Sequence, residues 1–124
     1  MSRQAPLESR RVLVVEDQYY LASDICEWLE GAGATVVGPV GNAAKAFDIL
    51  NGQNVDTAVV DINLGLGPTF DLAQALSERG VPFLFATGYD AAAIPAQFES
   101  APRLEKPFNG SELVDALSAL AVAD

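Results

Sequence analysis

Polar side chains of complementary charge directly follow or end four short apolar runs of this sequence. Glu16 and Asp17 follow "RVLVV", Asp61 ends "DTAVVD", Thr87 ends "VPFLFAT", and Lys106 follows "RLE". Three carboxylates gathered in one place repel one another, so a fold tolerates them when a cation joins them. Oxygen ligands of this kind suit Mg²⁺, which binds through one or two carboxylates, waters and a phosphate oxygen. A divalent ion and the lysine together would balance the three negative charges.

The apolar runs and the amphipathic stretches between them predict the elements that must position these groups. Strands are predicted at 11–15, 35–40, 56–61, 81–87 and 103–105, with an amphipathic helical pattern in most of the intervening segments and after the last strand. Strict alternation with short connections predicts an α/β domain, a doubly wound parallel sheet with helices on both faces. Because the carboxyl ends of parallel strands share one edge, we expect the polar groups to meet there.

Local signals refine this arrangement. Pro39 cannot donate to a strand ladder, so the strand at 35–40 is expected at a sheet edge. Asn42 is a predicted helix cap, and Asn109 with Glu112 forms a predicted capping box. Pro95 limits the segment before the last strand to a short helix.

Composition excludes several classes of protein. Residues 1–10 are expected to be a flexible lead-in and residues 11–124 a single domain. No apolar run approaches the length of roughly 20 residues that a membrane-spanning helix needs. There is no histidine, and the single Cys26 fits a buried thiol in the reducing cytoplasm. A net charge of −10 would repel nucleic acid and anionic membranes, which favours a protein or small cationic partner.

Each polar group also has a simpler explanation when it is taken alone. Asp17 could cap a helix, Asp61 could end a strand in a turn, Thr87 could be an ordinary strand residue, and Lys106 could pair with a surface acid. Four strand ends supply complementary groups while the predicted edge strand supplies none. That pattern favours a functional site.

The motifs "VVEDQ", "VVDINLG", "FATG" and "EKPF" occur in this order and together resemble the receiver domain of bacterial two-component response regulators. The resemblance extends from about Arg11 to Ala121. It implies a flavodoxin-like (βα)5 fold with strand order 2-1-3-4-5.

The resemblance also implies roles for the acidic residues. Asp61 would be the phosphoacceptor, whose carboxylate attacks a phosphohistidine of a histidine kinase and becomes an acyl phosphate. Asp17 would bind Mg²⁺ directly, and Glu16 directly or through water. The backbone carbonyl of Asn63 would be a further ligand.

Four further positions also receive roles, three of them implied by the resemblance. Lys106 would pair with a phosphoryl oxygen, and Thr87 would donate a hydrogen bond to another. A cis peptide is expected before Pro107, because proline makes a cis bond accessible. Gly88 would let the backbone approach the phosphoryl group closely.

Two departures from the usual receiver pattern concern the conformational switch. Arg103 stands where receivers usually carry an aromatic residue, and the fourth helix is shortened. Together with "PFLFATGYD", these features resemble the stand-alone "FAT GUY" receivers and imply stress or adaptation signalling. The switch candidates are then Thr87, Gly88, Tyr89 and Arg103, with an order change across 88–102. Tyr89 and Asn63 could flank the acyl phosphate, or Tyr89 could only cover the top of the sheet.

The expected function is therefore a single-domain response regulator without an output domain. It would catalyse only its own phosphorylation and dephosphorylation, so it is not expected to be an enzyme for other substrates. It would signal by binding a target protein or by passing the phosphoryl group to a phosphotransfer protein.

Three rival functions remain from the sequence. A flavodoxin-type carrier is disfavoured because the acidic "EDQYYL" would repel a flavin phosphate. A phosphatase of the haloacid dehalogenase type needs an acid where Asn63 stands. A degenerate receiver that binds a partner without phosphorylation is the alternative that only an assay separates.

Overall fold

Five parallel strands form one sheet in the order β2-β1-β3-β4-β5. The computed structural model describes residues 6–62, 69–88, 94–98 and 100–120. Its strands are β1 (Arg11–Val15), β2 (Thr35–Val40), β3 (Thr57–Asp61), β4 (Phe83–Thr87) and β5 (Arg103–Glu105). The α/β fold and the strand order predicted from the sequence are confirmed.

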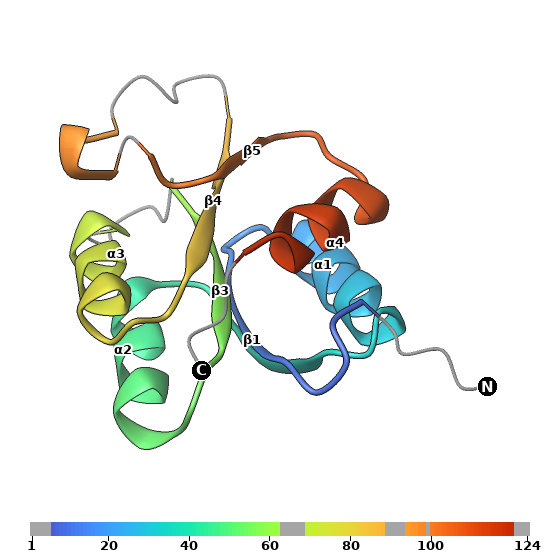
Figure 1. Ribbon diagram of the computed structural model, residues 1–124, viewed down its shortest axis with the longest axis horizontal. Helices are drawn as coiled ribbons and strands as arrows, with labels where there is room; N and C mark the ends of the chain where they lie inside the picture. Colours follow the sequence, from blue (N-terminus) through green and yellow to red (C-terminus); the bar gives the residue numbers. More distant parts are fainter. Residues whose placement is uncertain (1–5, 63–68, 89–93, 99, 121–124) are drawn as a thin grey trace.

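Helices cover both faces of the sheet (Figure 1). They are α1 (Tyr19–Gly31), α2 (Ala43–Gly52), α3 (Thr69–Glu78), the 3-10 helix η2 (Ala96–Phe98) and α4 (Gly110–Ser118). In β1, Leu13 and Val15 pack with the core on the side of α2 and α3, whereas Val12 and Val14 pack on the side of α1 and α4. Both faces of β1 are therefore buried, which explains its continuous apolar sequence.

The local signals that bound these elements operate as predicted. Strand β2 lies at the sheet edge, as Pro39 predicted. The Asn42 side chain accepts a hydrogen bond from the Lys45 amide at 2.9 Å. Asn109 and Glu112 form a reciprocal capping box at the start of α4. These caps fix where α2 and α4 begin.

The connection between β4 and β5 has only the 3-10 helix η2 within the residues that the structure describes there. Phe98 of this turn is buried against Phe70, Phe83 and Phe85, with ring centroids 6.0 to 6.3 Å apart. This matches the predicted shortening of the fourth helix. One aromatic anchor holds the short segment to the core.

The chain joins the core earlier than the predicted boundary at residue 11. Leu7 is fully buried, and its amide donates to the Ala32 carbonyl at 2.9 Å. This contact depends on α1 lying nearby, so the local sequence does not reveal it. Across the described ranges, no helix has the length and apolar character needed to span a membrane.

Candidate functional site

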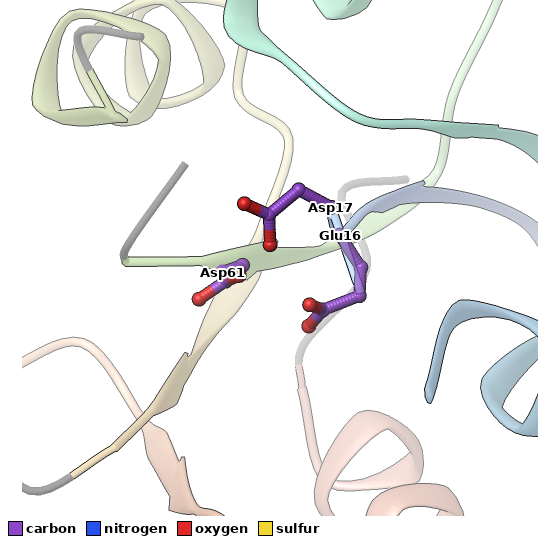
Figure 2. A group of neighbouring side chains, drawn as sticks. All are labelled: Glu16, Asp17 and Asp61. Atoms are coloured by element: carbon purple, nitrogen blue, oxygen red, sulfur yellow. The ribbon is translucent and has the colours of Figure 1, made fainter. Parts of the chain in front are cut away.

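Three carboxylates meet where β1 and β3 end. Glu16 and Asp17 directly follow β1 and Asp61 is the last residue of β3; these strands are neighbours, with Val15 opposite Val60. One carboxylate oxygen from each acid lies within 4.8 Å of the other two, and Figure 2 shows the side chains entering the same region. Glu16 and Asp61 are 3% and 2% exposed, whereas Asp17 is exposed. The cluster therefore has buried acids on one side and water on the other.

Lys106 supplies a positive charge to this cluster from the end of β5. Its Nζ lies 3.1 Å from Glu16 Oε1 and 3.4 Å from Asp61 Oδ1. Its amide donates to the Thr87 carbonyl at 2.7 Å, and the Lys106–Pro107 peptide is cis, as the resemblance implies. The lysine thus pairs with the site acids, and the alternative of a surface ion pair does not hold.

The donor set fits a hard divalent cation. Three carboxylates and one lysine leave two negative charges uncompensated among these four side chains. Glu16 Oε2 accepts from the Gln18 amide at 3.1 Å. Glu16 Oε1 is buried and, despite its ion pair with Lys106, accepts no hydrogen bond of acceptable geometry in the described part of the chain. Such oxygens suit Mg²⁺, and Glu16, Asp17 and Asp61 are the residues that would hold it. Asn63, the further predicted ligand, lies outside the described residues.

Asp17 does not cap the helix that follows it. Helix α1 begins at Tyr19, its N-cap residue is Gln18, and that end has no side-chain cap hydrogen bond. The simpler structural explanation for Asp17 therefore fails. Its carboxylate is instead one of the three that converge.

Thr87 ends β4 at the same edge of the sheet. Its neighbour Ala86 lies opposite Asp61, and Thr87 itself lies opposite Glu105 and is 2% exposed. Thr87 therefore lies one residue after the position in β4 that pairs with Asp61, and it brings a hydroxyl to the same edge of the sheet. This is the placement that the sequence predicts.

Of the remaining switch candidates, the structure describes Gly88 and Arg103. Arg103 is exposed on β5, opposite Phe85. A Cβ built on Gly88 would meet no heavy atom within 4 Å, and its φ is not left-handed, so this structure itself gives no steric reason for glycine there. Tyr89 lies outside the described residues. The proposed order change across 88–102 likewise includes residues that the structure does not describe.

Sequence reasoning missed an exposed aromatic pair beside the acids. Tyr19 and Tyr20 are 78% and 81% exposed, and their rings meet edge to face with centroids 5.3 Å apart. Their positions outside the apolar stripe of α1, which includes Ile25 and Leu29, could have revealed them. A groove of about 480 Å³ also adjoins the site, lined in part by Trp28 and Lys106.

The sequence also matches a known family over residues 12–118, described as the response regulator receiver domain. The chain belongs to the response regulator receiver family. Its curated relatives include the transcriptional regulatory protein PdtaR of Mycobacterium tuberculosis, 28% identical over 112 residues. Another is the sensory transduction protein LytT of Bacillus subtilis, 28% identical over 111 residues. The chain is covered to 87% and 86%, but spans 55% and 46% of these relatives, about half their length.

Solved receiver structures agree over almost the whole chain. SdrG from Sphingomonas melonis Fr1 is 32% identical, with a TM-score of 0.77 and coverage of 96% of this chain and 98% of SdrG. A response regulator receiver protein from Sinorhizobium medicae WSM419 is 29% identical, with a TM-score of 0.78 and coverage of 90% and 94%. Receivers bind Mg²⁺ at an acidic pocket and work with histidine kinases and downstream targets.

Proposed function

We propose that this receiver accepts a phosphoryl group from a histidine kinase onto Asp61 in a Mg²⁺-dependent reaction. The observation that carries the proposal is the arrangement of charge around Asp61. Its carboxylate is nearly buried, lies with Glu16 and Asp17 within 4.8 Å, and contacts Lys106 at 3.4 Å. The geometry thus combines a nucleophile, a candidate cation site and an anion-pairing amine.

The chain's own residues divide the chemistry between them. An Asp61 carboxylate oxygen attacks phosphorus, a P–O bond forms, the P–N bond of phosphohistidine breaks, and the imidazole leaves with the bond's electron pair. Lys106 is placed to pair with a phosphoryl oxygen, and Thr87 brings a hydroxyl to the same edge. Mg²⁺ held by Glu16, Asp17 and Asp61 would offset the negative charge shared by the acids and the phosphoryl group.

The output is proposed to run through other proteins. Phosphorylated receiver would bind a target or pass the phosphoryl group to a phosphotransfer protein. The "PFLFATGYD" motif supports a stand-alone regulator of stress or adaptation. The protein would act in the cytoplasm and would catalyse no reaction other than its own phosphorylation and dephosphorylation.

Intact mass tests the proposal directly. The protein is incubated with Mg²⁺ and acetyl phosphate, or with a cognate kinase and ATP, and the added phosphoryl group is measured. We expect one group on the wild type and on Asp48→Asn, an exposed helix variant, and none on Asp61→Asn. Full labelling of Asp61→Asn would refute the assignment. Absence of label from every donor would favour the degenerate receiver.

A further inference from the structure

The edge strand β2 contains a bulge directly beside the acidic pair. In the ladder between β1 and β2, Leu13 lies opposite Val37, but Val15 lies opposite Val40, so the register shifts by one residue. Val14 therefore faces two residues, Gly38 and Pro39. A bulge of this kind increases the local twist and changes where the following backbone is directed.

Gly38 is the residue that makes this bulge possible. Its φ is +101°, a backbone conformation that side chains disfavour. A Cβ on Gly38 would lie 3.0 Å from the Val40 amide nitrogen and 3.1 Å from the Val14 carbonyl oxygen. Both atoms belong to the backbone of the ladder itself. A side chain at this position would therefore displace Val40 relative to β1.

The residues after the bulge bond to the backbone of Glu16 and lie beside that of Asp17. The Val40 carbonyl accepts a hydrogen bond from the Glu16 amide at 2.9 Å. Gly41 lies beside Asp17, since a Cβ built on Gly41 would be 3.8 Å from the Asp17 Cα, an ordinary contact. A displacement at Val40 would therefore act first on Glu16, whose buried carboxylate has little freedom to compensate.

Packing of the core does not explain the extra residue. Side chains alternate between the two faces of a strand, so a β2 without Pro39 would still place Val37 and Val40 on the same face. They would also remain opposite Leu13 and Val15 in an unbroken ladder. What the unbroken ladder would lack is the added twist at the point where β2 meets Glu16 and Asp17.

We propose that the Gly38 bulge is a positioning feature for the acidic pair, which holds Glu16 and Asp17 in the geometry that a divalent cation requires. This inference rests on the proposed function, because Mg²⁺ is the cation for which the pair would be positioned. Gly38 acts through the Val40 carbonyl and touches neither the cation nor the phosphoryl group.

Calorimetric titration with Mg²⁺ tests the proposal on Gly38→Ala and on a variant with Pro39 deleted. The matched control is Gly41→Ala, in the same turn and nearer to Asp17, where a Cβ makes only ordinary contacts. We expect roughly tenfold weaker Mg²⁺ binding for both bulge variants, as is common when the residues supporting metal ligands are altered. The control should stay within about twofold of the wild type, since it leaves those supports in place.

Amide exchange in metal-free protein gives a second readout that does not depend on the cation. The Glu16 amide should exchange faster than in the wild type in both bulge variants, and at the wild-type rate in Gly41→Ala. Folded bulge variants with wild-type Mg²⁺ affinity and wild-type Glu16 protection would overturn the inference. If Gly38→Ala does not fold, the Pro39 deletion decides the matter by the same two measurements. Wild-type protein that binds no Mg²⁺ would instead refute the proposed function, and the exchange of Glu16 would still show whether the bulge holds the pair.

Discussion

Replacing Asp61 by asparagine is expected to make the metal-free protein more stable. The change removes one of three clustered carboxylates and keeps the shape of the side chain. It also removes the contact between Asp61 and Lys106, so the sign of the effect depends on which charge interactions are larger.

The distances allow these interactions to be compared. At an effective dielectric constant of about 20, Lys106 at 3.4 Å attracts the Asp61 carboxylate by about 5 kcal/mol. Glu16, within 4.8 Å, repels it by at least about 3.5 kcal/mol on the same scale. Asp17 adds a smaller repulsion because it is exposed to water. Attraction and repulsion therefore nearly cancel, and the desolvation of a buried charge, several kcal/mol per ion, decides the sign.

We expect Asp61→Asn to raise the free energy of unfolding by about 1 to 3 kcal/mol, because a buried neutral amide is less costly than a buried carboxylate. For a domain of this size, the melting temperature should rise by roughly 4 to 12 °C. The assay is thermal unfolding in EDTA at pH 7, with Asp48→Asn as the control for a surface carboxylate. Added Mg²⁺ should stabilise the wild type more than the variant. A folded Asp61→Asn protein that melts below the wild type in EDTA would refute the reasoning.

Three further substitutions or treatments test other parts of the structure. Lys106→Met removes the cation that contacts Glu16 and Asp61, so it should lower the free energy of unfolding of the metal-free protein by about 3 to 5 kcal/mol, and Mg²⁺ should restore part of the loss. Denaturant unfolding in EDTA and in Mg²⁺ measures both effects. A variant as stable as the wild type in EDTA would contradict this account. Gly110→Ala would place a Cβ 2.7 Å from the Trp28 ring and should lower the free energy of unfolding by about 1 to 3 kcal/mol. In the control Gly52→Ala the new Cβ meets nothing within 4 Å, so that variant should be as stable as the wild type or slightly more stable in the same unfolding assay. Burial raises the pKa of the Cys26 thiol, and Glu30 adds to the shift. Alkylation of Cys26 by iodoacetamide at pH 8 should therefore be slower than that of a free thiol and should accelerate at higher pH. Equal alkylation rates for Cys26 and a free thiol at pH 8 would show that the thiol is not perturbed.

Much of the fold and of the site could be predicted because both depend on features that are local in sequence. Apolar runs, caps and glycines define each element, and parallel strands bring their carboxyl ends to one edge. The positions of Asp17, Asp61 and Lys106 at or just after predicted strand ends were therefore enough to group them. The position of Pro39 was sufficient to place β2 at the edge of the sheet.

The features that escaped prediction depend on contacts between distant segments. The bulge at Gly38 exists only in the register of β2 against β1, which the sequence of β2 alone does not specify. Leu7 is buried because α1 ends beside it. The contact of Lys106 with both Glu16 and Asp61 depends on the ends of three separate strands. The sequence could predict that these side chains lie near one another, but not which atoms pair.

Locating the phosphoryl group within the chain tests the central claim most directly. Protein treated with acetyl phosphate and Mg²⁺ is reduced with borohydride, which converts an aspartyl phosphate to homoserine, and its peptides are sequenced by mass spectrometry. The account predicts homoserine in place of Asp61 alone, in amounts that fall to background in EDTA. Homoserine at Asp17 or at any other aspartate, or labelling of Asp61 that is unchanged by EDTA, would contradict it.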